Sequence, residues 1–283
     1  MTEFNCLKAG AYHMKRVLVL LLALSLCLTL SACGDSASQP AATSTPAQTS
    51  DMAYVKEKGT LIVGITEFEP MDYQDQNGNW IGFDAEMAAA FAQSLGVSAQ
   101  FEVIEWDNKV SLLNDKAIDV VWNGMTLSSD IRSSMETSNS YFNNAQVVIV
   151  KANAASRYQT TESLADATFV VESSSAGQEQ AETHGFSYTE VPNQAVALQR
   201  VSAGEYDAAI IDFLMAKTLV GEATRYSDLA YTVSLSSEEY GVGFRKGSDL
   251  AAALNDFFVA KYTDGSMQSI ARKYGIAAFL LAQ

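Results

Sequence analysis

Residues 101–124 read FEVIEWDNKVSLLNDKAIDVVWNG, with two apolar runs on either side of a more polar segment. FEVIEW (101–106) and IDVVWNG (118–124) are rich in β-branched and aromatic residues, so each predicts a strand. DNKVSLLNDK (107–116) predicts a short helix between them. A strand, a helix and a second strand in succession are typical of a crossover unit, whose two strands run parallel in one sheet.

The same alternation is present upstream. TLIVGIT (60–66) is a continuous apolar run that predicts a strand. FDAEMAAAFAQSL (83–95) has large apolar residues four apart and predicts an amphipathic helix. We expect Asp84 to cap the start of this helix and Gly96 to end it.

Downstream, the alternation restarts. The predicted strands are QVVIVK (146–151), TFVVES (168–173), SYTEV (187–191) and DAAIID (207–212), and the predicted helices are residues 176–185 and 193–204. YGVGFRK (240–246) predicts a further strand, and two helices separated by Gly265 follow it. We therefore expect an α/β fold of two lobes, each a mainly parallel sheet flanked by helices, with a ligand cleft between them.

The composition also predicts where these lobes begin and end. We assign residues 52–145 and 238–283 to lobe 1, and residues 146–237 to lobe 2. Residues 34–51 are rich in Ser, Thr, Ala and Pro and have almost no large apolar side chain, so we expect a flexible tether there.

Residues 14–33, MKRVLVLLLALSLCLTLSAC, have the composition of an export signal. Two basic residues precede an apolar run, and small residues precede Cys33. We interpret residues 1–33 as a signal peptide that starts at Met14. The ending Leu-Ser-Ala-Cys resembles a bacterial lipobox, which implies cleavage before Cys33 and a lipid on its sulfur. A single anchoring helix is the less favoured alternative, because the apolar run is short.

The cysteine count excludes several kinds of site. Cys6, Cys27 and Cys33 all lie in the leader, so the folded part has neither a disulfide nor a cysteine-based metal or redox site. We expect no cofactor.

The net charge of the chain is −15, and residues 1–33 carry three basic residues and one acidic residue, so the remainder has a charge of −17. Such a field repels nucleic acid and anionic lipid. It either keeps an exported protein soluble, which is the favoured interpretation, or selects a cationic ligand.

Five stretches occur in an order and spacing that is specific when they are taken together: GTLIVGI, DYQDQNGNWIGFDAEMAAAFAQSLGV, EWDNKVSLLNDKAIDVVWNGMT, ALQRVSAGEYDAAIID and EEYGVGFRKGSDL. With them the chain resembles, over residues 54–275, the bacterial periplasmic solute-binding proteins for polar amino acids, the receptors of ABC importers. The resemblance implies the two-lobed type II fold, capture of a polar amino acid by lobe closure, and no enzymatic activity. It also implies a monomer that is lipid-anchored at the extracellular face of the membrane, with an ABC permease and ATPase as partners and no nucleic acid.

The resemblance implies a set of ligand contacts. Asp212 matches the acid that takes the ligand ammonium, although an N-cap of the following helix is an equally good interpretation. Gly124 and Thr126 match backbone and hydroxyl contacts from lobe 1. Ser174 and Ser175 stand where the family has Gly and then Ser or Thr, opposite the ligand carboxylate.

Further candidates have competing interpretations. Phe68 matches an aromatic wall of the cleft, with a core position as the alternative. Trp122 either lines the cleft or packs beneath it. Glu67, Glu69 and Asp72 lie in a loop that borders the cleft in the family, so they either make the cleft acidic or are simply solvated.

The family pattern places an arginine five positions after the lobe 1 threonine, where it binds the ligand carboxylate. Counting from Thr126 gives Ile131, and Arg132 is one position later. If the loop has gained one residue, Arg132 faces the cleft. If nothing is inserted, Ile131 faces the cleft and Arg132 points about 100° away. Both interpretations stay open.

The shifted arginine and the acidic loop that contains Glu67, Glu69 and Asp72 leave two alternatives for the function. Without the arginine, the ligand is a cationic amine or another compound that lacks the usual carboxylate. An enzyme similar to the dehydratases of this fold is the second alternative, with Glu67 and Asp212 as paired carboxylates. Against an enzyme, the part of the chain after the leader has one histidine, His184, and no G-x-S-x-G or H-E-x-x-H motif.

Overall fold

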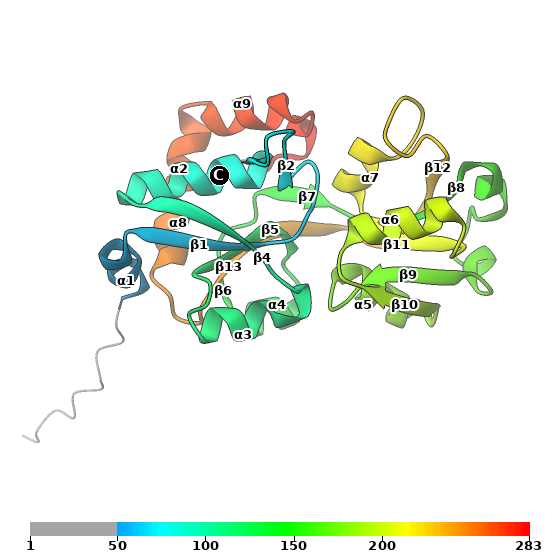
Figure 1. The fold of residues 1–283 in the computed structure, drawn as a ribbon, viewed down its shortest axis with the longest axis horizontal. Helices are drawn as coiled ribbons and strands as arrows, with labels where there is room; N and C mark the ends of the chain where they lie inside the picture. Colours follow the sequence, from blue (N-terminus) through cyan, green and yellow to red (C-terminus); the bar gives the residue numbers. More distant parts are fainter. Residues whose placement is uncertain (1–49) are drawn as a thin grey trace, which may run out of the picture. The chain divides into compact units, whose positions relative to one another are not determined.

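The computed structural model describes residues 50–283, which form two lobes (Figure 1). The expected signal peptide, Cys33 and residues 34–49 of the expected tether lie outside the described residues. The described residues belong to one compact unit. Within the described part of the chain, the helices are too short or too polar to cross a bilayer.

Lobe 1 is built on a mixed sheet with the strand order β4-β1-β5-β13-β6, and β7 also pairs with β13. β1 runs parallel to β4 and β5, whereas β13 runs antiparallel to β5. The strands of this sheet are β1 (Thr60–Ile65), β4 (Ser98–Val103), β5 (Val120–Thr126), β6 (Glu136–Thr137), β7 (Phe142–Asn144) and β13 (Glu238–Phe244), and a small hairpin consists of β2 (Tyr73–Gln74) and β3 (Trp80–Ile81).

Helices cover both faces of this sheet. In Figure 1, α2 and α9 lie on one face, and α3 and α4 lie on the other. The helices are α1 (Asp51–Lys58), α2 (Phe83–Leu95), α3 (Lys109–Asn114), α4 (Ser129–Ser134), α8 (Leu250–Thr263) and α9 (Ser266–Lys273), with 3₁₀ turns η1 (Trp106–Asn108) and η4 (Ala277–Phe279). Trp122 is fully buried between Phe91 of α2 and Phe258 of α8, so these large aromatic side chains hold the helices onto the sheet.

Asp84 does not cap α2, contrary to the expectation from sequence. The helix begins at Phe83 after Gly82, and Asp84 is fully buried. Its carboxylate accepts hydrogen bonds from the Gly124 backbone N–H at 2.7 Å and from the Tyr141 hydroxyl. Because the first turn of α2 faces the core, Asp84 binds a backbone N–H of β5 and not the free N–H groups at the start of its own helix.

Lobe 2 is a mixed sheet with the order β10-β9-β11-β8-β12, in which β9 runs parallel to β10 and β11. α6 and α7 lie on one face and α5 on the other (Figure 1). The elements are β8 (Gln146–Lys151), η2 (Ala152–Arg157), η3 (Glu162–Leu164), β9 (Thr168–Glu172), α5 (Ala176–His184), β10 (Ser187–Val191), α6 (Gln194–Ala203), β11 (Ala208–Asp212), α7 (Phe213–Leu219) and β12 (Leu229–Ser234).

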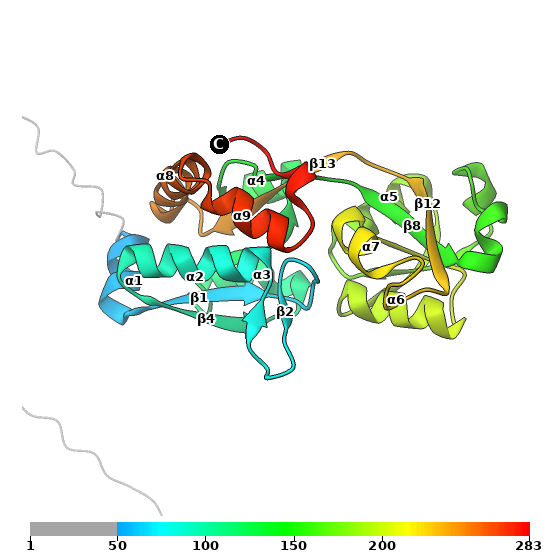
Figure 2. The same cartoon turned by 90° about the horizontal axis from the view of Figure 1, so that it is seen from above.

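Within the described residues, the chain passes between the lobes in two places, from β7 to β8 and from β12 to β13 (Figure 2). These passages explain why the sheets are mixed. Strands joined through a crossover helix run parallel, whereas β8 and β13 enter their sheets from the opposite lobe and run antiparallel to β11 and β5. The two passages form a double connection around which the lobes can rotate.

The start of the described chain is fixed to lobe 1. Ser50 caps α1, and Asp51, which we assigned to the tether, is the first residue of this helix. The Asp51 carboxylate accepts a hydrogen bond from Nε of the buried Arg245 at 3.0 Å, and the same guanidinium donates to the Leu113 and Ile118 carbonyl oxygens. Since a paired guanidinium with several acceptors is strongly held, α1 is part of the lobe 1 core.

Candidate functional site

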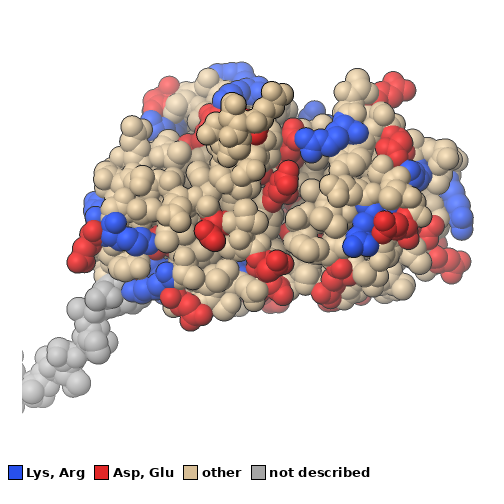
Figure 3. Space-filling view, viewed as in Figure 1, with Lys and Arg blue, Asp and Glu red and all other residues tan. Residues whose placement is uncertain are grey.

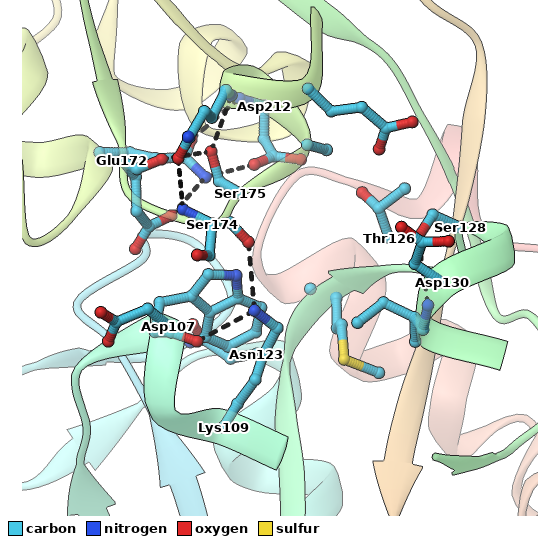
Figure 4. Close-up of a pocket in the computed structure, with 18 of the residues that line it drawn as sticks. Asp107, Lys109, Asn123, Thr126, Ser128, Asp130, Glu172, Ser174, Ser175 and Asp212 are labelled. Carbon is cyan, nitrogen blue, oxygen red and sulfur yellow. Dashed lines mark hydrogen bonds between the residues drawn. The ribbon is translucent and has the colours of Figure 1, made fainter. Parts of the chain in front are cut away.

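A cleft of about 430 Å³ lies between the lobes, within the range of small-molecule sites. Figure 4 shows its side chains projecting from the ends of strands and the starts of helices in both lobes. Of the residues predicted from sequence, the cleft is lined by Phe68, Gly124, Thr126, Ser174, Ser175 and Asp212.

The floor of the cleft in lobe 1 is the end of β5. Gly124 has φ +55°, and a Cβ there would lie 2.6 Å from Cε1 of Phe68 and 3.1 Å from Cε2 of Tyr240. Only glycine fits both this backbone conformation and this space. Phe68 is buried edge-on against Tyr240 and also lines the cleft, so it is both a core residue and part of the cleft wall.

Asp212 ends β11 in lobe 2 and is only 4% exposed. It occupies the N-cap position of α7 without making a side-chain cap bond. Its carboxylate instead accepts hydrogen bonds from the Tyr240 hydroxyl at 2.6 Å, from Gln146 Nε2 at 3.0 Å, and from the side-chain amides of Asn144 and Gln194. Burial and then the nearby Glu238 raise the pKa of Asp212 to about 7, against the effect of these donors.

Glu172, at the end of β9, is a second buried acid in the cleft, and the sequence analysis missed it. It is 3% exposed, and burial, followed by the charge of Asp212, raises the pKa of its carboxyl to about 8. The signal that could have found it is its place in TFVVE, because an acid at the carboxyl end of a buried parallel strand lies where ligands bind in α/β sheets.

Lys109, the first residue of α3, is a buried cation that the sequence analysis also missed. Its Nζ donates to the carbonyl oxygens of Trp106 at 3.0 Å and Ser174 at 3.1 Å, and lies 4.8 Å from the centre of the Trp106 ring. Burial lowers the pKa of Lys109 to about 8. DNKVSLLNDK alone gives no signal that this lysine is buried, because the segment reads as an ordinary exposed helix.

The turn after β9 faces Lys109 from lobe 2. Ser174 has φ +54°, a conformation that favours glycine and agrees with the glycine that the family pattern places there. Its backbone N–H donates to Gln178 Oε1. Ser175 caps α5 by accepting from the Gln178 N–H at 3.2 Å, and its hydroxyl donates to the Glu172 carbonyl oxygen. This turn is therefore rigid.

Three predicted residues do not line the cleft. Arg132 is exposed and borders a separate hollow, whereas Ile131 lines the cleft. These positions agree with the alternative in which the loop after Thr126 has gained no residue. Trp122 packs beneath the cleft, because the outward side of β5 is covered by α2 and α8. Glu67 is exposed outside the cleft.

Comparison with known proteins identifies the family. The family described as "Bacterial extracellular solute-binding proteins, family 3" matches residues 61–277. The chain belongs to this family. It is 30% identical to the L-cystine-binding protein TcyJ of Escherichia coli (strain K12) over 78% of this chain and 84% of that protein. It is 26% identical to the arginine-binding extracellular protein ArtP of Bacillus subtilis (strain 168), over 92% of this chain and 98% of ArtP. The Gly52Ala mutant of arginine-bound ArgBP from T. maritima has a similar structure, with a TM-score of 0.68 and 29% sequence identity. The match covers 72% of this chain and 97% of ArgBP.

The cleft of this solute-binding protein is strongly acidic. Among the described residues, its lining includes six carboxylates and one lysine, and no arginine; the carboxylates are Asp107, Asp130, Glu172, Glu179, Glu182 and Asp212. Figure 3 shows acidic side chains along the boundary between the lobes. Because the acidic side chains outnumber the single lysine, the field inside the cleft favours a ligand with positive charge.

The same cleft is poorly suited to a metal ion. Within residues 50–283, no group of three or more His, Cys, Asp or Glu side chains is close enough to hold one. The lining of this solute-binding protein offers acids, amides and hydroxyls, which can form hydrogen bonds to a polar organic molecule.

Proposed function

We propose that this chain is the extracellular receptor of an ABC importer, which captures a cationic amino acid or a related amine by closing its lobes. One observation carries the proposal: six carboxylates and a single, already bonded lysine line the cleft. A cationic ligand offsets the mutual repulsion of these acids, whereas an anionic ligand adds to it. The ligand ammonium binds against Asp212 Oδ2, which accepts one hydrogen bond, from Gln194, whereas Oδ1 already accepts three.

The ligand carboxylate, when there is one, has only a weak anchor. Ile131 occupies the position from which a guanidinium would bind it in two parallel hydrogen bonds. Lys109 has one N–H left after its two carbonyl contacts, and a single ammonium N–H binds a carboxylate less specifically than an arginine fork. Binding therefore depends mainly on the cationic groups of the ligand.

The relatives support a receptor for amino acids, since TcyJ is named for cystine and ArtP for arginine. We further propose that the receptor releases its ligand unchanged, acts as a monomer, and is held at the outer face of the membrane by a lipid on Cys33. The permease and ATPase of the importer are its partners.

The test is thermal unfolding of residues 48–283 with arginine, lysine, agmatine, cadaverine, glutamine and glutamate, each added separately. A ligand at about 100 times its Kd adds about 2.7 kcal/mol to the free energy of unfolding. For a domain of this size the melting temperature rises by roughly 5–10 °C. We expect a rise with the cationic compounds, including a decarboxylated amine, and none with glutamate. A rise with glutamate or glutamine alone would contradict the proposal, and a change in the mass of the recovered ligand would show an enzyme.

A further inference from the structure

We propose that Glu172 is a specificity-determining residue: together with Asp212 it holds one cationic group of the ligand, which displaces a proton that the two acids retain. This inference rests on the proposed function and adds the acid that discriminates charged from neutral ligands. It also predicts that binding releases a proton to the solvent.

The two carboxylates are held together by one side-chain amide. Gln194, at the start of α6, donates from Nε2 to Asp212 Oδ2 and lies 3.4 Å from Glu172 Oε2. Its Oε1 accepts the Asp212 backbone N–H at 2.9 Å, which fixes the orientation of the amide. Glu172 and Asp212 therefore form a unit on one wall of the cleft, from the ends of β9 and β11, which pair in the sheet.

One oxygen of this unit has no hydrogen-bond donor. Glu172 Oε1 is buried and accepts no hydrogen bond from the described residues. The Thr66 hydroxyl is near enough to lower the pKa of Glu172 slightly, but it donates to Asn123 Oδ1 at 2.8 Å. A buried acceptor without a donor is unusual in a folded protein, and this one belongs to a residue that lines the cleft. An ammonium or guanidinium of the ligand supplies the missing donor.

The charges around Glu172 favour retention of a proton in the absence of a cation. Lys109 faces it from α3 and lowers the pKa of Glu172, but this effect is smaller than those of burial and of Asp212, which raise it. Asp212 faces it from β11, and Glu238 of β13 adds a further negative charge near Asp212. Asp107, from η1, lies close to Lys109.

Burial raises the pKa of Glu172 to about 8 and that of Asp212 to about 7, and each carboxylate opposes ionisation of the other. Near pH 7.5 the pair therefore retains a substantial part of one proton. A bound cation favours the fully ionised pair, so the proton leaves to the buffer as the ligand enters.

The test is calorimetric titration of residues 48–283 with arginine and with agmatine at pH 7.5, in phosphate and in Tris. These buffers differ in ionisation enthalpy, so the difference in heat gives the number of protons released. For the unchanged chain we expect release of between half a proton and one. Glu172→Gln should abolish most of this release and weaken the binding of both probes at least tenfold.

Glu190→Gln is the matched control, because it removes one acid from the neighbouring strand β10 outside the cleft. It should leave proton release and affinity unchanged. Glu172→Asp keeps the charge and should keep the proton release with a weaker affinity, and it replaces Glu172→Gln if that variant does not fold.

The outcomes separate the two proposals. If the unchanged chain binds arginine or agmatine and Glu172→Gln binds it equally well with the same proton release, the role of Glu172 is overturned and the proposed function stands. If the unchanged chain binds neither of these probes nor lysine, the proposed function fails, and the two-acid subsite fails with it.

Discussion

Lys109 Nζ donates a hydrogen bond to the carbonyl oxygen of Ser174 at 3.1 Å and so joins lobe 1 to lobe 2 across the cleft. A second connection lies at the rim, where Arg225 of lobe 2 and Glu69 of lobe 1 form an ion pair at 3.2 Å. The first bond is partly buried and the second is exposed. We therefore expect Lys109 to contribute more to the closed arrangement, because water screens the outer pair.

Lys109→Met should shift the lobes toward an open arrangement and weaken ligand binding about tenfold or more. Hydrogen bonds to charged groups contribute about 1.5–3 kcal/mol, and this one exists only while the lobes are close. Small-angle scattering with ligand should give a larger radius of gyration for the variant. Lys56→Met, on the exposed side of α1, is the control and should leave the ligand affinity and the radius of gyration unchanged. Equal scattering curves for Lys109→Met and the unchanged chain would show that the bond does not hold the lobes.

The neighbours Ile131 and Arg132 should respond differently to substitution. Arg132→Ala should change the affinity for arginine less than twofold, because Arg132 is exposed outside the cleft. Ile131→Arg places a guanidinium among the cleft residues, so it should strengthen binding of an amino acid relative to its decarboxylated amine, by about tenfold or more. Calorimetry with arginine and agmatine measures both effects. A large loss of arginine binding in Arg132→Ala would show that this residue reaches the ligand.

Gly124→Ala should destabilise the protein by about 2–4 kcal/mol, because it combines a positive φ with a Cβ only 2.6 Å from the Phe68 ring. Gly78→Ala is matched to it, since Gly78 has φ +80° and open space around it. We expect a cost of only about 1 kcal/mol there. Urea denaturation measures both variants. Equal costs would mean that the backbone conformation alone, and not the crowding under the cleft, requires glycine at position 124.

The stability of the ligand-free protein should fall between pH 5.5 and pH 7.5. Burial raises the pKa of Glu172 to about 8, and those of Asp84 and Asp212 to about 7. In this range the folded chain binds more protons than the unfolded chain, so raising the pH lowers the free energy of unfolding, by up to about 1.4 kcal/mol per pH unit for each group. Urea denaturation at the two pH values tests this.

Glu172→Gln should make this pH dependence shallower, while Glu190→Gln should leave it unchanged, because Glu190 is exposed. Stability that rises steadily from pH 5.5 to pH 7.5 would show that these acids are ionised in the folded protein.

The periodicity of the sequence predicts most of the regular elements, because each has a continuous apolar strand or a helix with one apolar face. QVVIVK becomes β8, Gln146–Lys151, and FDAEMAAAFAQSL becomes α2, Phe83–Leu95. The short strands β6 and β7 were not predicted, since two or three residues carry no measurable period.

The site was less predictable, because its geometry depends on contacts between residues far apart in the chain. Asp84 looks like a cap in its own helix, yet its partners are Gly124 and Tyr141. Glu172 and Lys109 enter the cleft only because β9 ends and α3 begins at its edge. Counting from Thr126 left both Ile131 and Arg132 open as the residue that faces the cleft. Ile131 lines it, and the choice between the two required the orientation of α4.

The two passages of the chain between the lobes also set the order in which the lobes can fold. The strands of lobe 2 lie in one continuous segment between Gln146 and Ser234, whereas lobe 1 needs β13, Glu238–Phe244, at an inner position of its sheet. As the exported chain emerges from the membrane, the later segment can therefore complete its sheet before the earlier one. The amino-terminal half must wait for the last part of the chain, and during that interval the edge of β5 that later pairs with β13 is open to binding by a chaperone.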